Sequence, residues 1–291
     1  MAGTPNLPPH WKTNPAGGVR QYQKAEARLW SQLKSVRDWL LETWEQLPVR
    51  RVEINALHVN ETYYEYLIST EELQRIVAEL KRRLGEEVDE EYFWSQVNTA
   101  YQQGTGAAVA NLAAISSDYT RDITQVLTSQ SYQRRVALLR ARIFEEMQGF
   151  EGETGKDLAR VLSNAVEVGE SPLETAKTIR ERFDVSRSRA ERIARTEITG
   201  ALRQGRIDED RDANEISGVR TRLLWLSALS PTTRASHAAR HGNLYSAQEC
   251  KEFWNTGANQ INCKCATVSV AVDDEGNPLT PGVIERVRRA K

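Results

Sequence analysis

Residues 225–242 read WLSALSPTTRASHAARHG, and residues 262–265 read NCKC. This part of the chain concentrates four side chains that can coordinate a metal, namely His237, His241, Cys263 and Cys265. Histidines four residues apart share one face of a helix, and alternate residues of a strand point to the same side. Two imidazoles and two thiolates form the donor set of a closed tetrahedral zinc site. The pattern therefore predicts a structural zinc site, and the alternative is a surface histidine pair with cysteines packed in a core. The spacing leaves open whether Cys250 belongs to the site.

Two segments rich in β-forming residues flank this stretch and predict a small sheet. VRTRLLWLSAL (219–229) and INCKCATVSVAV (261–272) are the two convincing strands of the chain. Residues 157–213 precede them and predict three helices, one starting at Ser171-Pro172 and another at Asp184 or Ser186. We therefore expect an α+β C-terminal domain over residues 155–280, with a small antiparallel sheet.

The N-terminal half predicts a mainly α region. Periodic apolar residues favour helices over 19–47, 69–84, 88–103 and 118–147, whereas 49–68 is ambiguous between strand and helix. The small residues of GTGAAVANLAAIS (104–116) indicate close helix packing, and the glycines of GFEGETGK (149–156) indicate a linker. The expected organisation is an extended arm (1–18), a helical docking region (19–150), the C-terminal domain and a basic tail (281–291).

Composition excludes several classes of function. The 39 basic and 40 acidic residues balance to a net charge of −1, so no basic field covers the whole surface to attract nucleic acid. Three cysteines confined to one segment do not form a disulfide framework and fit a reducing compartment. We find no signal peptide and no apolar run near the ~20 residues of a membrane span. These features predict a soluble protein made in a cytoplasm, without a membrane partner.

Several motifs in a fixed order resemble the Mu F-like family of phage minor head proteins, also called head morphogenesis proteins. The resemblance covers about residues 155–272 and includes ERIARTEITGALRQGR (191–206), an aromatic residue near KEFW and the closing NCKC. The matching positions are Arg195, Thr196, Glu197, Trp225, Arg234, His237, Gly242, Cys263 and Cys265. The chain departs from the family at Ser230, where members often carry Asp, so no role of that carboxylate is carried over.

The resemblance implies a virion component at the portal vertex and in the head interior, made in the host cytoplasm. Its expected partners are the portal protein and the major capsid protein, with contact to packaged DNA, and its expected role is head assembly with a part in DNA packaging or ejection. The competing prediction is a metal-dependent hydrolase or nuclease built on His237, His241, Cys263 and Cys265. Four protein ligands leave no open coordination position, and no HExxH or HNH-like pattern is present, so we expect no enzyme. A DNA-binding module is the third alternative, but acids interleave with its arginines and predict only modest affinity.

Overall fold

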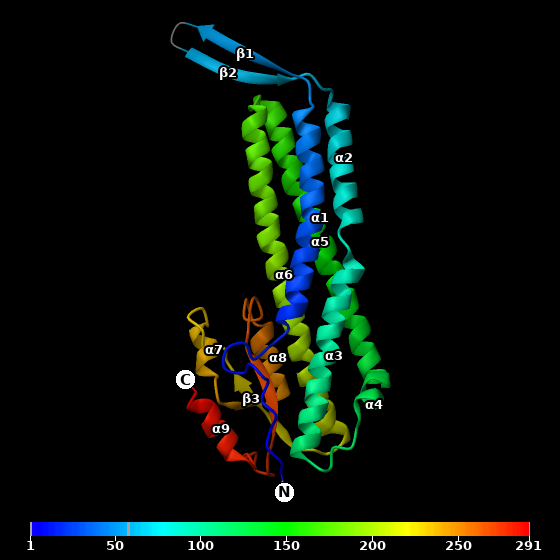
Figure 1. The fold of residues 1–291 in the computed structure, drawn as a ribbon, viewed down its shortest axis with the longest axis vertical. Helices are drawn as coiled ribbons and strands as arrows, with labels where there is room; N and C mark the ends of the chain where they lie inside the picture. The colour runs from blue at the N-terminus through cyan, green and yellow to red at the C-terminus, as the bar shows by residue number, and fades with distance from the viewer. Residues whose placement is uncertain (1, 57–58, 291) are drawn as a thin grey trace. The chain divides into compact units, whose positions relative to one another are not determined.

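The computed structural model describes residues 2–56 and 59–290 and is mainly helical, which confirms the predicted fold class (Figure 1). It divides into two compact units. Unit 1 consists of Met1–Lys24, Trp94–Arg140 and Arg192–Lys291, and unit 2 consists of Ala25–Phe93 and Ala141–Glu191. The elements are α1 (Val19–Glu45), β1 (Val49–Ala56), β2 (Val59–Tyr66), α2 (Thr70–Glu87), α3 (Glu90–Ile115), α4 (Ile123–Thr128), α5 (Gln130–Val168), α6 (Pro172–Ile216), β3 (Thr221–Leu226), α7 (Ala235–Ala239), β4 (Leu244–Tyr245), α8 (Ala247–Asn255), β5 (Ala266–Ala271) and α9 (Pro281–Arg288).

Unit 2 is a helical bundle that carries a hairpin. The apolar stripe predicted on α1 is buried, with Leu29, Leu33, Val36, Leu40 and Trp44 at most 2% exposed. The two tryptophans off this stripe are covered by arginines: Arg187 lies 4.6 Å from the ring centre of Trp30, and Arg83 lies 4.6 Å from that of Trp39. These cation–π contacts explain why aromatic side chains outside the stripe do not form an exposed patch.

The ambiguous segment 49–68 is an antiparallel hairpin formed by β1 and β2. Among the described residues these strands pair only with each other, from Val49 opposite Tyr66 to Ala56 opposite Val59. Ring centres of Tyr66 and Trp44 lie 5.0 Å apart, which packs the base of the hairpin on α1. Ser69 then caps α2, which confirms the helix predicted from residue 69, and Glu72 is the reciprocal partner in the capping box.

The glycine-rich segment 149–156 is not a linker, which corrects the sequence-based expectation. It lies inside α5, which is continuous from Gln130 to Val168. Phe150, Thr154 and Leu158 are buried at helical spacing, and this burial outweighs the roughly 1 kcal/mol that each glycine costs in a helix. A Cβ on Gly155 would lie 3.4 Å from Leu84 of α2, so this glycine lets α5 pack closely.

Unit 1 holds the predicted sheet, with strand order β4-β3-β5 and antiparallel pairing throughout. Leu224, Leu226, Val268 and Val270 form its core on one face with apolar residues of α9. The segment expected to be a basic tail is therefore mostly a packed helix, whose Val283, Ile284 and Val287 are buried.

Helices α3 and α6 approach each other closely within unit 1, as the small residues of 104–116 predicted. A Cβ on Gly104 would lie 2.2 Å from the carbonyl oxygen of Leu202. A Cβ on Gly205 would lie 2.4 Å from the carbonyl oxygen of Tyr101. Both positions require glycine because real Cβ atoms do not come this close to backbone.

The N-terminal arm lies on unit 1. Backbone hydrogen bonds join Gly3 to Ile115 and Ala16 to Lys264, and the backbone N–H of Asn6 donates to Asn111 Oδ1 over 2.7 Å. Leu7 and Trp11 pack against the sheet core. The arm therefore packs against other residues of the same chain.

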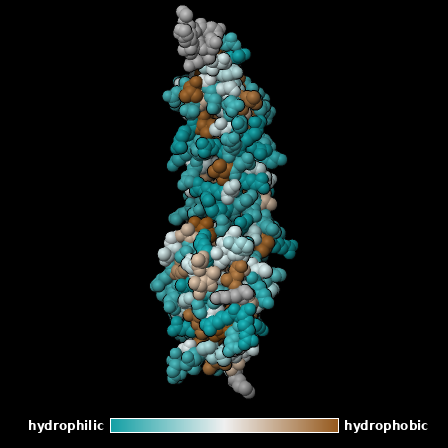
Figure 2. Space-filling view, turned by 90° about the vertical axis from the view of Figure 1, so that its left-hand side faces the viewer, coloured by the Kyte–Doolittle hydropathy of each residue, from teal (hydrophilic) through white to brown (hydrophobic). Residues whose placement is uncertain are grey.

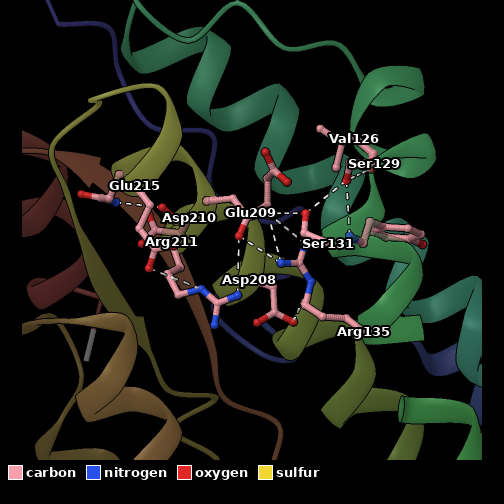
Figure 3. A network of polar contacts seen from close by, with 12 residues as sticks. Val126, Ser129, Ser131, Arg135, Asp208, Glu209, Asp210, Arg211 and Glu215 are labelled. Carbon is pink, nitrogen blue, oxygen red and sulfur yellow. Dashed lines mark hydrogen bonds and ion pairs between the residues drawn. The ribbon is translucent and has the colours of Figure 1, made fainter. Parts of the chain in front are cut away.

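A network of polar contacts joins α5 and α6 in unit 1 (Figure 3), and Tyr101 of α3 also contributes to it. Arg135 donates to both oxygens of Asp212 over 3.0 Å, and Tyr101 donates to Asp208 over 2.9 Å. Lys251 of α8 also lies 2.9 Å from Asp208. Each buried acid thus has a cation or hydroxyl partner, as buried charges require.

The surface is mostly polar. On the face shown in Figure 2 hydrophilic residues predominate, and hydrophobic ones occur singly or in small groups. Among the described residues, no helix has both the length and the apolar character needed to span a membrane.

Candidate metal centre

The aromatic residues around Trp225 build the floor of the candidate site. Trp225 of β3 is fully buried and stacks on Trp254 of α8, with ring centres 4.3 Å apart and planes 24° apart. Phe253 meets the Trp225 ring edge-on at 5.2 Å. The His237 ring lies edge-on to Phe253 at 4.9 Å. These rings hold α7, α8 and β3 together and fix the plane of the imidazole.

Three of the four predicted ligands come together. Nδ1 of His237 lies 3.4 Å from Cys263 Sγ and 3.6 Å from Cys265 Sγ, and all three ligand atoms lie within 4.8 Å of one another. Zinc bonds of about 2.0–2.3 Å in tetrahedral geometry place neighbouring N and S ligands about 3.6 Å apart. The separations therefore fit one metal ion. In the described part of the chain this is the one group of three or more His, Cys, Asp or Glu side chains placed to hold a metal.

His241, the predicted fourth ligand, is not in this group. Its Nδ1 accepts a hydrogen bond from the backbone N–H of Ser227 over 3.0 Å, and its Nε2 lies 3.0 Å from the carbonyl oxygen of Val287. Helix α7 ends at Ala239, so the two histidines do not share a helix face. His241 instead joins the end of β3 to α9.

Cys250 also lies outside the group. It is fully buried on α8 in the aromatic cluster, and burial raises the pKa of its thiol to about 12. A thiol held protonated in this way packs as a small apolar side chain.

Electrostatics favour a thiolate at Cys263. The hydrogen bond from Cys265 lowers the pKa of Cys263 most, and the contacts with His237, Arg203 and Trp254 lower it further. Trp254 Nε1 donates to Cys263 Sγ over 3.4 Å. The pKa of Cys265 is raised in turn by its hydrogen bond to Cys263 and by burial. The pair therefore holds one stable thiolate, and a cation between the sulfurs is needed to deprotonate both.

The loop that carries the cysteines is held by side chains of the recognised motifs. The backbone N–H of Asn262 donates to Thr196 Oγ1 over 3.1 Å, and Arg203 donates to the carbonyl oxygen of Cys263 over 2.7 Å. Arg234 donates to the carbonyl oxygens of Asn259 and Ile261 over 3.3 and 2.8 Å. These bonds keep the loop in place although Asn262 has a positive φ of 53°.

The other motif residues have separate positions. Arg195 lies 5.3 Å from the ring centre of Tyr22, and Glu197 is buried in α6. Gly242 has a φ of +75°, and a Cβ there would lie 2.5 Å from Arg288 Cγ. Gly242 is thus required for the turn that brings β4 to β3.

Sequence reasoning missed Arg203, Ser227 and Arg240. Ser227 Oγ donates to the carbonyl oxygen of His237 over 2.5 Å. Arg240 lies 3.8 Å from the ring centre of Tyr245 and 4.2 Å from that of Phe253. These contacts depend on how α6, α7, α8 and β3 pack together, so no local pattern signals them.

An open cavity of about 300 Å³ borders the three ligands. Its wall includes His237, Cys263 and Cys265, and the basic residues Arg195, Arg234 and Lys264 also line it. Hydroxyl groups of Ser230, Thr232 and Thr233 complete the polar lining. The three side chains that could hold a metal therefore border an open, polar cavity.

Comparison with known proteins places this site within a family. Residues 156–268, from the second half of α5 into β5, match the family described as Phage Mu protein F like protein. No curated protein and no solved structure gives a significant match. The match contains the motif residues of α6, the aromatic floor, His237 and both ligand cysteines. The C-terminal part of the chain thus matches the model of the Phage Mu F-like family, and this match suggests a phage head morphogenesis protein.

Proposed function

We propose that this chain is a minor head protein of a tailed phage that acts in head assembly at the portal vertex. The observation that carries the proposal is the family match over residues 156–268. The proposal places the protein inside the head, in contact with the portal protein or the major capsid protein. A role in DNA packaging or ejection, with contact to the packaged DNA, belongs to the same proposal.

The docking part of the molecule is proposed to be the hairpin end of unit 2. Most of unit 2 lies outside the matched residues. The edges of β1 and β2 can pair with a strand of another chain. Tyr63, Val168 and Leu173 lie at the hairpin or at the α5–α6 turn and are 38%, 60% and 74% exposed. The backbone N–H of Tyr64 donates to the carbonyl oxygen of Gly169, which brings the hairpin and the turn together.

Paired surface variants test the docking role. Val168→Ser with Leu173→Ser removes two exposed apolar side chains of unit 2, and Leu138→Ser with Ile216→Ser removes two of unit 1 that are 68% and 66% exposed. We expect the first pair to lose co-purification with portal protein and incorporation into procapsids, and the second pair to retain both. Equal incorporation of the two pairs would place the docking surface elsewhere.

We further propose that His237, Cys263 and Cys265 hold a zinc ion that clasps α7 to the loop before β5. Support comes from the ligand separations and from the thiolate favoured at Cys263. A zinc ion bound only by the folded state stabilises that state.

The zinc content of the purified protein tests the clasp. We expect about one zinc per chain in the parent, because one ion satisfies the donor set. Cys263→Ser with Cys265→Ser should abolish zinc binding and lower the unfolding temperature. Cys250→Ala is the matched control, since it removes the third cysteine and should keep the zinc. A metal-free parent, or zinc retained by the double variant, contradicts the clasp.

One observation favours a second candidate function. Three protein ligands beside a cavity leave an open coordination position, which is the arrangement of a catalytic zinc. A metal-dependent hydrolase or nuclease would place its substrate phosphate near Arg195 and Lys264. The zinc-loaded parent should then cleave DNA or a small phosphodiester, and the His237→Ala variant treated with zinc in the same way should not. A zinc-loaded parent without activity eliminates this candidate and leaves the structural clasp.

A further inference from the structure

A second cavity, of about 200 Å³, lies in unit 1 along the free edge of β5. The arm covers it with residues 6–9, and α3 contributes Ala107, Ala108 and Asn111. Leu223, Arg206 and residues 267–269 complete the lining. Except for a few polar groups this lining is apolar.

One polar side chain of β5 beside this cavity, Thr267, lacks a hydrogen-bond partner. Thr267 is fully buried, yet its Oγ1 has no hydrogen-bond partner among the described residues. The carbonyl oxygens of Ser269 and Ala271 accept bonds from Asn111 and from the backbone of Leu279. Because odd-numbered residues of β5 thus face away from β3, the backbone N–H groups of Thr267 and Ser269 also point to the free edge. A buried hydroxyl without a partner costs about 1–3 kcal/mol.

Arg206 supplies an unbalanced positive charge at the same cavity. It donates one hydrogen bond, to the carbonyl oxygen of Pro15 over 3.3 Å, and no acid among the described residues forms an ion pair with it. A guanidinium has five N–H donors, so most of them lack a protein acceptor. Burial, and then the charge of Arg203, lower the pKa of Arg206 to about 10. Arg206 is half-buried and lines the cavity, so its remaining donors are open to an anionic partner there.

We propose that this cavity binds a small carboxylate with an apolar tail. Arg206 and the Thr267 hydroxyl would hold the carboxylate, and the backbone N–H groups at the β5 edge would complete its hydrogen bonds. The tail would lie among Leu7, Ala108 and Val268.

Charge and size decide the ligand class. One carboxylate balances one guanidinium, whereas a phosphate dianion would leave a negative charge in an apolar cavity. The volume equals that of about seven water molecules, which suits an aliphatic acid of about six carbons or the last residue of a polypeptide. A free acid and the C-terminus of a polypeptide both present a carboxylate next to an apolar group. The proposal stands apart from the head-assembly role and from the zinc clasp.

Binding of hexanoate to the full chain tests the proposal, with 1-hexanol as the neutral control of equal length. Ligand-observed NMR and titration calorimetry should detect hexanoate and not hexanol. A pentapeptide ending in leucine with a free carboxylate, against its C-terminal amide, distinguishes the sources. Binding of hexanoate alone indicates a free acid, and binding of the peptide indicates a polypeptide terminus. Absence of both, or equal binding of hexanol, overturns the proposal.

Variants assign the binding to this cavity. Arg206→Gln should weaken hexanoate binding at least tenfold, whereas Arg220→Gln, an exposed arginine of the same unit, should leave it unchanged. Ala108→Leu fills the cavity and should abolish binding, while Ala113→Leu on the exposed side of α3 should not. Equal affinities within either pair would refute the assignment.

Thr267→Val keeps the proposal testable if a cavity variant fails to fold. Valine has the shape of threonine without the unpaired hydroxyl, so it should raise the unfolding temperature of the ligand-free protein. The same change should weaken hexanoate binding about three- to tenfold, because one hydrogen bond to a charged group is lost. Unchanged affinity would show that the hydroxyl has no ligand, which overturns the proposal.

Discussion

Gly104→Ala is expected to destabilise unit 1, whereas Gly106→Ala, two residues further along α3, is expected to stabilise it. Both variants make the same chemical change in the same helix. A Cβ at position 104 would lie 2.2 Å from the carbonyl oxygen of Leu202, but a Cβ at position 106 would meet only Ile123 Cδ1 at 3.8 Å. The first is a clash with the backbone of α6, and the second is an ordinary contact.

The size of the effect follows from two terms. Replacing glycine by alanine inside a helix contributes about 1 kcal/mol of stability at both positions. At position 104 the backbone of α6 must move by about 1 Å to relieve the clash, and overpacking of this kind costs about 1–3 kcal/mol or more. Gly104→Ala should therefore lose up to about 2 kcal/mol net. Because the helix term is common to both variants, they should differ by the clash cost of about 1–3 kcal/mol.

Urea unfolding followed by circular dichroism measures this difference, and tryptophan fluorescence, to which the buried Trp225 and Trp254 of unit 1 contribute, is a second probe. Thermal unfolding should move by about 2–4 °C for each kcal/mol. Gly205→Ala is a second test from the α6 side, because its Cβ would lie 2.4 Å from the carbonyl oxygen of Tyr101. If Gly104→Ala is as stable as Gly106→Ala, the close approach of α3 and α6 is wrong.

Three further predictions concern buried charge and a turn. Burial, and then Glu90, raise the pKa of Glu151 to about 7. A carboxyl whose folded pKa lies above its unfolded value favours folding most below about pH 4.5, and this stability is lost as pH rises through 7. At pH 8 the free energy of unfolding of Glu151→Gln should thus exceed that of the parent by about 1–2 kcal/mol, a value reduced for the partial exposure of the side chain. At pH 4 the two proteins should be equally stable. A difference that stays constant across pH would contradict this reasoning. Asp212→Asn removes the carboxylate that Arg135 binds at 3.0 Å and leaves it Asp208 at 3.7 Å. It should cost about 3 kcal/mol by urea unfolding, against about 0.5 kcal/mol or less for the exposed Glu215→Gln. Gly242→Ala should cost about 1–3 kcal/mol because of its positive φ and the contact with Arg288, whereas Gly282→Ala, with nothing within 4 Å, should not destabilise; equal stabilities would show that the turn tolerates a side chain.

Local patterns predicted the elements whose stability is itself local. The apolar stripe of α1 and the N-terminus of α2 at Ser69 depend on residues three or four apart. The equivalent capping box of Ser246 at the start of α8 was not predicted. Ser171 was also placed correctly, since its hydroxyl accepts from the backbone N–H of Glu174 at the start of α6. The strands β3 and β5 stood out because their residues are β-branched or apolar and both faces of the sheet are covered.

The lengths of α5 and α6 could not be predicted because tertiary burial overrides local stop signals. Ser186 was expected to begin a helix, yet its hydroxyl donates to the carbonyl oxygen of Arg182 four residues earlier, within α6. Phe183 and Ala190 are buried on either side of it and keep the helix continuous. Whether a serine begins a helix or lies inside one depends on neighbours that the local sequence does not show.

The candidate site shows the same limit in the placement of ligands. The i, i+4 spacing of His237 and His241 suggested a shared helix face, but α7 has only five residues and ends before His241. The alternating cysteines, by contrast, do point their sulfurs to one side, as extended backbone requires. A spacing argument holds only if the element is long enough to contain both residues.

The contacts of the motif residues explain why they occur as an ordered set. Thr196 and Arg203 of α6 bind the backbone on either side of Asn262, and Arg234 binds the same loop from the start of α7. These residues bind backbone groups of the cysteine loop, so they determine where the two sulfurs stand relative to the imidazole. The motif residues position this loop around the three ligands, and a cavity lies beside them. The same arrangement serves a structural zinc ion and a catalytic one. The zinc content and the activity of the zinc-loaded parent therefore have to be measured together, because neither one alone separates the two.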